Sequence, residues 1–131
     1  MDGTALQELA VRTATDLPGV THEHPFGPGW EVLKVSGKVF VLVTEVPGEP
    51  VAIVKCDPED GQALRQQHPG ITPGYHMNKR HWITLHGERD LTPLLVAELV
   101  RDSYLLVRDG LPRSRRPVLP DDLRRERERS H

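Results

Sequence analysis

Three apolar runs separated by two short turns dominate the first half of the sequence. The runs are WEVLKV (30–35), KVFVLV (38–43) and VAIVKC (51–56), with Ser36-Gly37 and PGEP (47–50) between them. Runs rich in Val and Ile that are bounded by Gly, Pro and Ser are typical of β-strands. Strands joined by turns as short as these run antiparallel. The pattern therefore predicts an antiparallel meander.

The segment that precedes the meander has the spacing of an amphipathic helix. TALQELAVRTATDLPG places its apolar residues on one stripe. Thr4 and Gln7 have the spacing of a capping box, which predicts the start of the helix at Thr4. Pro18-Gly19 predicts its end.

Two further helices and a fourth strand are expected after the meander. Asp57-Pro58 has the composition of a helix start and predicts a short helix to about residue 68. HWITLH (81–86) alternates apolar and polar residues, which predicts a strand. Thr92-Pro93 predicts the start of a last helix, and Gly110 predicts its end.

This order of elements predicts an α+β fold. Helices that surround an antiparallel meander form a two-layer sandwich, with the helices on one face of the sheet. We expect the first and last helices to pack against that face through Leu6, Leu9, Val96 and Val100. Residues 1–112 would form this domain, whereas residues 113–131 have too few apolar side chains to pack. We expect that segment to be mobile, with a frayed helix at DDLRRERER.

Charge is distributed unevenly between these two parts. The chain has 131 residues and a net charge of −2. Residues 1–112 contain 10 Lys and Arg against 15 Asp and Glu, a net charge of −5, and residues 113–131 contain 7 Arg against 4 acids, a net charge of +3. An acidic body argues against a protein that coats nucleic acid along its whole surface. Any cationic surface must therefore be local.

Compartment and assembly follow from simple features of the sequence. One cysteine excludes an intrachain disulfide. The apolar run 38–43 is far too short to cross a bilayer, and the N-terminal MDGTALQEL lacks the basic and apolar stretches of a signal peptide. We expect a cytoplasmic protein with no membrane partner, and we favour a monomer.

Several separated motifs together resemble one family. HEHPFG, KVSGKVFVLV, VKCDPEDGQALRQQHPGITPGYHMNKRHW and DSYLLVRDGLP are similar to the MmcQ/YjbR family of small bacterial proteins, and the resemblance covers roughly residues 4–112 in unbroken order. It implies a frataxin-like (CyaY-like) fold. It also implies DNA binding through hairpins described as a double wing. Nothing from the family transfers to residues 113–131.

The segment PGYHMNKRHW (73–82) concentrates cationic and aromatic side chains. It offers cations for phosphate, an amide that can pair with adenine and rings that can stack on a base. The candidate contacts within it are Tyr75, His76, Asn78, Lys79, Arg80, His81 and Trp82. Lys34 and Lys38 flank the Ser36-Gly37 turn, and Lys55 ends the next strand, so these three lysines join the predicted DNA-binding set.

Two other interpretations of the cationic segment stay open. In one it is a turn set by Pro73-Gly74, with aromatic side chains that pack and cations that are merely solvated. In the other it is the receptor of a binding module for a protein or a small anionic ligand. A ligand site would be concave and partly apolar, whereas a DNA-binding surface would join the segment to the lysines of the hairpin.

Metal and catalytic chemistry receive little support from the sequence. His76, His81, His86 and Cys56 lack the paired spacing of a structural zinc site, and we expect no metal and no cofactor. Cys56 precedes the helix start at Asp57, where a helix dipole favours a thiolate. The neighbouring acids oppose ionisation, and a cysteine that ends an apolar strand is usually buried. We therefore expect an inert cysteine and a protein that is not an enzyme.

Overall fold

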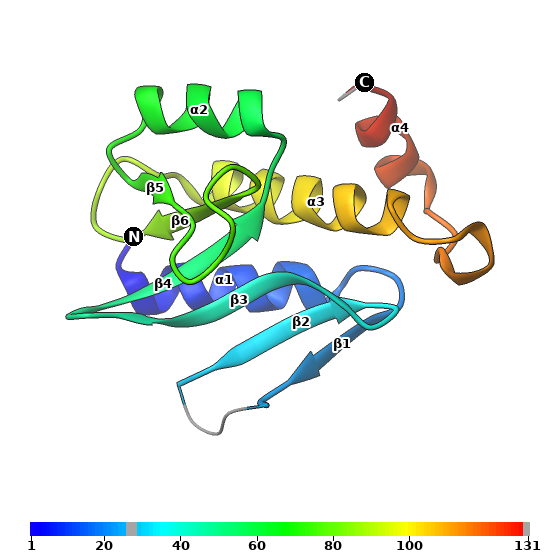
Figure 1. Cartoon of the computed structure of the whole chain (residues 1–131), viewed down its shortest axis with the longest axis horizontal. Helices are drawn as coiled ribbons and strands as arrows, with labels where there is room; N and C mark the ends of the chain where they lie inside the picture. Colours follow the sequence, from blue (N-terminus) through cyan, green and yellow to red (C-terminus); the bar gives the residue numbers. More distant parts are fainter. Residues whose placement is uncertain (26–28, 130–131) are drawn as a thin grey trace.

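The chain forms an antiparallel sheet with helices against one face (Figure 1). The computed structural model describes residues 1–25 and 29–129. Within these residues the elements are α1 (Gly3–Thr15), β1 (Val20–Glu23), β2 (Glu31–Val35), β3 (Lys38–Val46), β4 (Glu49–Lys55), α2 (Pro58–Gln67), β5 (Ile71–Pro73), β6 (Trp82–His86), α3 (Pro93–Asp109), the 3-10 helix η1 (Arg113–Arg115) and α4 (Asp121–Arg129). The strand order is β1-β2-β3-β4-β6-β5, and every neighbouring pair is antiparallel. The predicted α+β class and antiparallel sheet are confirmed.

The predicted meander corresponds to β2, β3 and β4. The turn between β2 and β3 has positive φ at both central residues, 47° at Ser36 and 83° at Gly37. Two central residues with positive φ are typical of the turn whose twist matches that of a two-stranded hairpin. Local turn chemistry thus explains the hairpin without help from distant residues.

The helix layer packs on the sheet through the residues that the helical stripes predicted. Leu6 of α1 and Val96 and Val100 of α3 are fully buried in the main core, and Leu9 packs against it. Both helices lie on the same face of the sheet, as expected (Figure 1). Among the described residues, no helix is both long and apolar enough to cross a membrane.

The start of α1 differs from the predicted capping box. Asp2, and not Thr4, is the N-cap, and its carboxylate accepts a hydrogen bond of 2.7 Å from the amide of Ala5. The side chain of Gln7 donates instead to the carbonyl oxygens of Thr44 at 2.8 Å and Val51 at 3.1 Å. Gln7 therefore ties α1 to β3 and β4 and cannot also close a box. The predicted caps at Asp57 and Thr92 are observed.

Two strands were not anticipated from the sequence. β1 and β5 are the edge strands of the sheet, with four and three residues respectively. Three of the four β1 side chains are exposed or nearly so, and the chain HEHP has no apolar alternation. Short edge strands depend on pairing with a neighbour rather than on their own pattern. Their partners, β2 and β6, become visible only in the folded chain.

Residues 113–131 pack where the sequence predicted no packing. Leu119 and Leu123 are each 4% exposed and belong to the main core. The guanidinium of Arg127 lies 2.8 Å from the Asp109 carboxylate, at the end of α3. Two leucines with flanking arginine contacts therefore suffice to seat α4, which is the helix expected at DDLRRERER (Figure 1). Mobility of the segment stays a prediction, but its expected lack of packing is wrong.

Candidate functional site

A second, smaller apolar cluster covers the face of the sheet that is turned away from α1 and α3. Its buried residues are Val32, Leu42, Val51 and Ile53. Side chains from outside these positions pack over them: Trp30, Val39, Val46, Tyr75, Met77 and Trp82. The segment 73–82 therefore lies against this face, as the loop between β5 and β6 in Figure 1 shows. We call this face the open face.

Hydrogen bonds give the segment 73–82 a defined shape. The Gly74 amide donates to the Trp82 carbonyl at 2.9 Å, and the Tyr75 amide donates to the Thr84 hydroxyl at 3.0 Å. A Cβ at Gly74 would lie 2.6 Å from the Trp82 Cβ, so only glycine fits there. The segment is thus an ordered turn, with Tyr75 and Trp82 packed as the turn interpretation expected.

The polar residues of the segment differ in what they leave available. The Asn78 Oδ1 accepts a hydrogen bond of 2.9 Å from the Arg80 amide, so this oxygen serves the turn itself. The Lys79 ammonium donates to the Gly74 carbonyl at 3.2 Å. Arg80 and His81 are exposed, and the His81 carbonyl accepts from the Cys56 amide at 2.8 Å. The Arg80–His81 turn therefore lies beside the end of β4.

His76 points to a different part of the open face. Its ring centroid lies 3.9 Å from that of Tyr75 and 6.0 Å from that of Trp30. Trp30 immediately precedes β2, whereas Lys38 begins β3, and these are opposite ends of the β2–β3 hairpin. His76 is therefore separated from the lysine end of the predicted set.

Lys38, Lys55 and Trp82 come together at one end of the open face. Lys55 pairs with Trp82 across β4 and β6, and opposite residues of antiparallel strands point to the same face. The three side chains line a shallow hollow of about 390 Å³, together with Val39 and the end of α3. Segments far apart in the sequence thus form one partly apolar, cationic hollow. We call it the basic hollow.

Lys34 has a different environment from the other lysines. Its ammonium lies 3.2 Å from the Glu23 carboxylate of β1, so a neighbouring charge offsets its own. The turn beside it is also occupied: the Arg115 guanidinium donates to the Ser36 carbonyl at 2.6 Å, and the Ser36 hydroxyl donates to the Arg115 carbonyl at 2.7 Å. Arg115 therefore adds a cation next to Lys38 that the sequence could not assign, because 79 positions separate it from Ser36.

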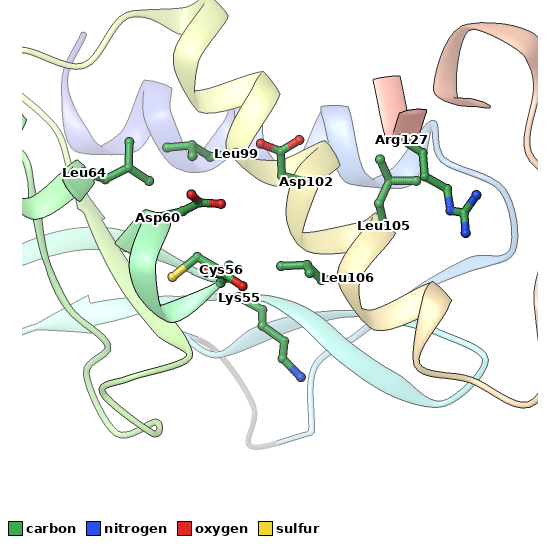
Figure 2. A pocket seen from close by; sticks show the side chains of 10 residues that line it. Lys55, Cys56, Asp60, Leu64, Leu99, Asp102, Leu105, Leu106 and Arg127 are labelled. Carbon is green, nitrogen blue, oxygen red and sulfur yellow. The ribbon is translucent and has the colours of Figure 1, made fainter. Parts of the chain in front are cut away.

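Cys56 lies in a second hollow, of about 370 Å³, between α2 and α3 (Figure 2). The thiol is 7% exposed, and burial raises its pKa to about 11, with Asp60 and Asp57 raising it further and Arg65 opposing them. A thiol with this pKa is protonated at neutral pH and is a poor nucleophile. This agrees with the inert cysteine predicted from the sequence.

The rest of the second hollow is apolar and acidic. Leucines of α2 and α3 form its walls, and Asp60 and Asp102 stand on opposite sides of Cys56 (Figure 2). Burial raises the pKa of Asp102 to about 6, and the charges of Glu126, Glu98 and Asp60 raise it further. The Lys55 side chain extends away from both carboxylates in Figure 2, so its ammonium serves the basic hollow.

Comparison with known proteins identifies the family. The YjbR family model matches residues 15–106. An uncharacterized protein, YbdF, of Escherichia coli O157:H7 is 43% identical over 111 residues, which cover 85% of this chain and 91% of that protein. The uncharacterized protein YjbR of Escherichia coli K12 is 36% identical over 87 residues, 66% of this chain and 74% of that protein.

Solved structures agree in fold. A Deinococcus radiodurans protein, DR2400, with the family-model domain DUF419, superposes with a TM-score of 0.71 at 34% identity and 80% coverage of both chains. A Pseudomonas syringae protein superposes with a TM-score of 0.66 at 28% identity, over 81% of this chain and 98% of that one. The family model and the curated relatives together cover most of the domain that contains the sheet, α1 and α3. The chain therefore belongs to the YjbR family.

Proposed function

We propose that this protein binds DNA through the phosphate backbone at the basic hollow and the adjoining Arg80–His81 turn, in a non-enzymatic accessory or regulatory role. The observation that carries the proposal is the shared lining of one hollow by Lys38, Lys55 and Trp82. A DNA-binding surface requires the hairpin lysines to adjoin the segment 73–82, and this hollow joins them.

Local charge supports phosphate binding at this place. Lys38 and Arg80 are exposed, and Arg115 is seated on the turn beside Lys38. Lysine and arginine near one another release counterions when they bind a phosphate chain, which is the main source of affinity for DNA. Trp82 is partly exposed beside them, so its ring can contact a sugar or an unpaired base.

The proposal differs from the initial set of ten residues in how it ranks them. Lys34, paired with Glu23, and Asn78, bonded within the turn, contribute less than the exposed cations. Tyr75 and His76 position the segment by stacking on one another near Trp30. Lys79 is exposed and can exchange its bond to a carbonyl for a phosphate. The role is non-enzymatic because the buried Cys56 thiol is protonated at neutral pH.

Titration of a fluorescent DNA duplex at about 50 and about 200 mM salt tests the proposal. We expect the Lys38→Gln/Lys55→Gln variant to bind every duplex more weakly and to flatten the slope of log affinity against log salt by about 1.8, at about 0.9 for each lost phosphate contact. The Lys79→Gln/Arg80→Gln variant should behave in the same way. The matched control is Arg12→Gln, which removes one exposed cation from α1 on the other side of the sheet.

Equal affinities of the double variants and the wild-type protein, with the fold intact, would refute the DNA-binding proposal. If the wild-type protein instead binds inorganic phosphate or a phosphorylated small molecule at the basic hollow, and no duplex, the alternative of a small-ligand binding module is correct. In that case the Lys38→Gln/Lys55→Gln variant should lose the small anion.

A further inference from the structure

Two histidines and a glutamate meet at the edge of the sheet, away from the basic hollow. His22 and His24 are two residues apart along edge strand β1, so their side chains lie on the same face. Glu31 begins β2, and the register that pairs Glu23 with Val32 sets Glu31 opposite His24. His22 pairs with Leu33, a residue of the main core, so this cluster is on the helix side of the sheet and not on the open face.

The three side chains are as close as metal ligands before a metal binds. The His22 Nε2 lies 2.8 Å and the His24 Nε2 lies 3.4 Å from the same Glu31 oxygen. All three donor atoms lie within 4.8 Å of one another. Ligands about 2.1 Å from a shared ion are about 3.0 to 3.4 Å apart in octahedral or tetrahedral geometry. Small rotations of partly exposed side chains close the remaining difference.

An ordinary ion pair does not explain the second histidine. Two other histidines pair with carboxylates, His68 with Asp90 and His86 with Glu49, each at 2.6 Å. In each of those pairs one imidazole meets one carboxylate. At Glu31 two imidazoles converge on one oxygen, and their ring centroids are 4.8 Å apart. Two cations there would repel each other, whereas two neutral imidazoles and a carboxylate are a complete set of three ligands.

We propose that His22, His24 and Glu31 bind a divalent transition-metal ion. Imidazole nitrogen with one carboxylate suits zinc, nickel, cobalt or copper, whereas calcium and magnesium take sets of oxygen ligands. Three protein ligands at an exposed strand edge leave further coordination positions to water. The site is independent of the proposed DNA binding, because it uses none of the residues of the basic hollow.

Calorimetric titration of the tag-free protein with Zn²⁺ and with Ni²⁺ at neutral pH tests the site. We expect one equivalent of metal per chain. Loss of an outer-shell partner alone weakens metal binding about 10- to 100-fold, so His22→Ala, His24→Ala and Glu31→Gln should each weaken it at least about tenfold. The control His68→Ala disrupts a histidine–carboxylate pair elsewhere and should bind metal as the wild-type protein does.

Nuclear magnetic resonance gives a readout that does not depend on affinity. Substoichiometric Ni²⁺ should broaden the ring signals of His22 and His24 first. A wild-type protein that binds no stoichiometric metal would overturn the proposal, as would a His24→Ala variant with unchanged affinity. Broadening centred on His68 or His86 would overturn it too. His24 is exposed, with 55% of its side-chain area accessible, so its loss should leave the thermal unfolding midpoint unchanged.

Discussion

Replacing Leu123 by alanine tests whether α4 is part of the folded domain. The side chain is 4% exposed and lies in the main core with Leu119. Truncating a buried leucine to alanine costs about 2 to 5 kcal/mol, from lost burial and from the cavity left behind. Leu123 lies on a terminal helix that can move toward the gap, so we expect about 2 kcal/mol, near the lower limit.

The other contacts of α4 set an upper limit to this loss. The pairs Arg127–Asp109 and Arg101–Glu126 are partly exposed, and such pairs contribute up to about 1 kcal/mol each. If Leu123→Ala removes most of the apolar contact, α4 undocks, and the remaining domain does not lose more than the docking energy. The measured destabilisation therefore reports how firmly α4 is held.

Urea denaturation followed by circular dichroism measures the effect. We expect the Leu123→Ala variant to unfold at lower urea with an unchanged dependence on denaturant, since both states keep their compactness. The control is Val118→Ala, because Val118 is 81% exposed in the same segment. Its free energy of unfolding should change by less than about 0.5 kcal/mol. A Leu123→Ala variant as stable as the control would refute the docking of α4.

Three further expectations concern buried groups. Cys56 should react with a thiol reagent at neutral pH far more slowly in the native protein than in urea, because burial raises its pKa to about 11; rapid native labelling would contradict this. Asp102 has a folded pKa of about 6, above its value in the unfolded chain, so its stabilising contribution is complete below pH about 4 and is lost as the pH rises through about 6. Asp102→Asn should therefore raise the unfolding temperature at pH 8 relative to the wild-type protein but not at pH 4, and equal shifts at both would exclude the ionisation. Gly74→Ala should lower both stability and DNA affinity, because the new Cβ meets Trp82; a variant unchanged in both thermal unfolding and duplex titration would show that the segment can adjust.

The candidate site was only partly predictable, because its residues depend on neighbours distant in the sequence. The pattern PGYHMNKRHW correctly drew attention to Arg80 and Trp82. It could not show that Asn78 bonds to the turn or that His76 stacks toward Trp30. Lys34 and Lys38 look equivalent in the sequence, and only the pairing of β1 with β2 brings Glu23 to Lys34.

The metal site shows the same limit from the other direction. His22 and His24 were visible in HEHPFG, but nothing in the sequence marked β1 as a strand. Without the strand, the two side chains have no common face and Glu31 has no place beside them. The register between β1 and β2 alone brings the three ligands together.

What the sequence determined by itself is local. The Ser36-Gly37 turn, the caps at Asp57 and Thr92 and the apolar stripe of α3 are set by residues within a few positions of one another, so their chemistry is readable along the chain. The tertiary structure alone decided the edge strands, the basic hollow and the seat of α4. Each of these is stabilised by burial or pairing between segments that meet only after folding, and the free energy of such contacts leaves no periodic trace in either segment.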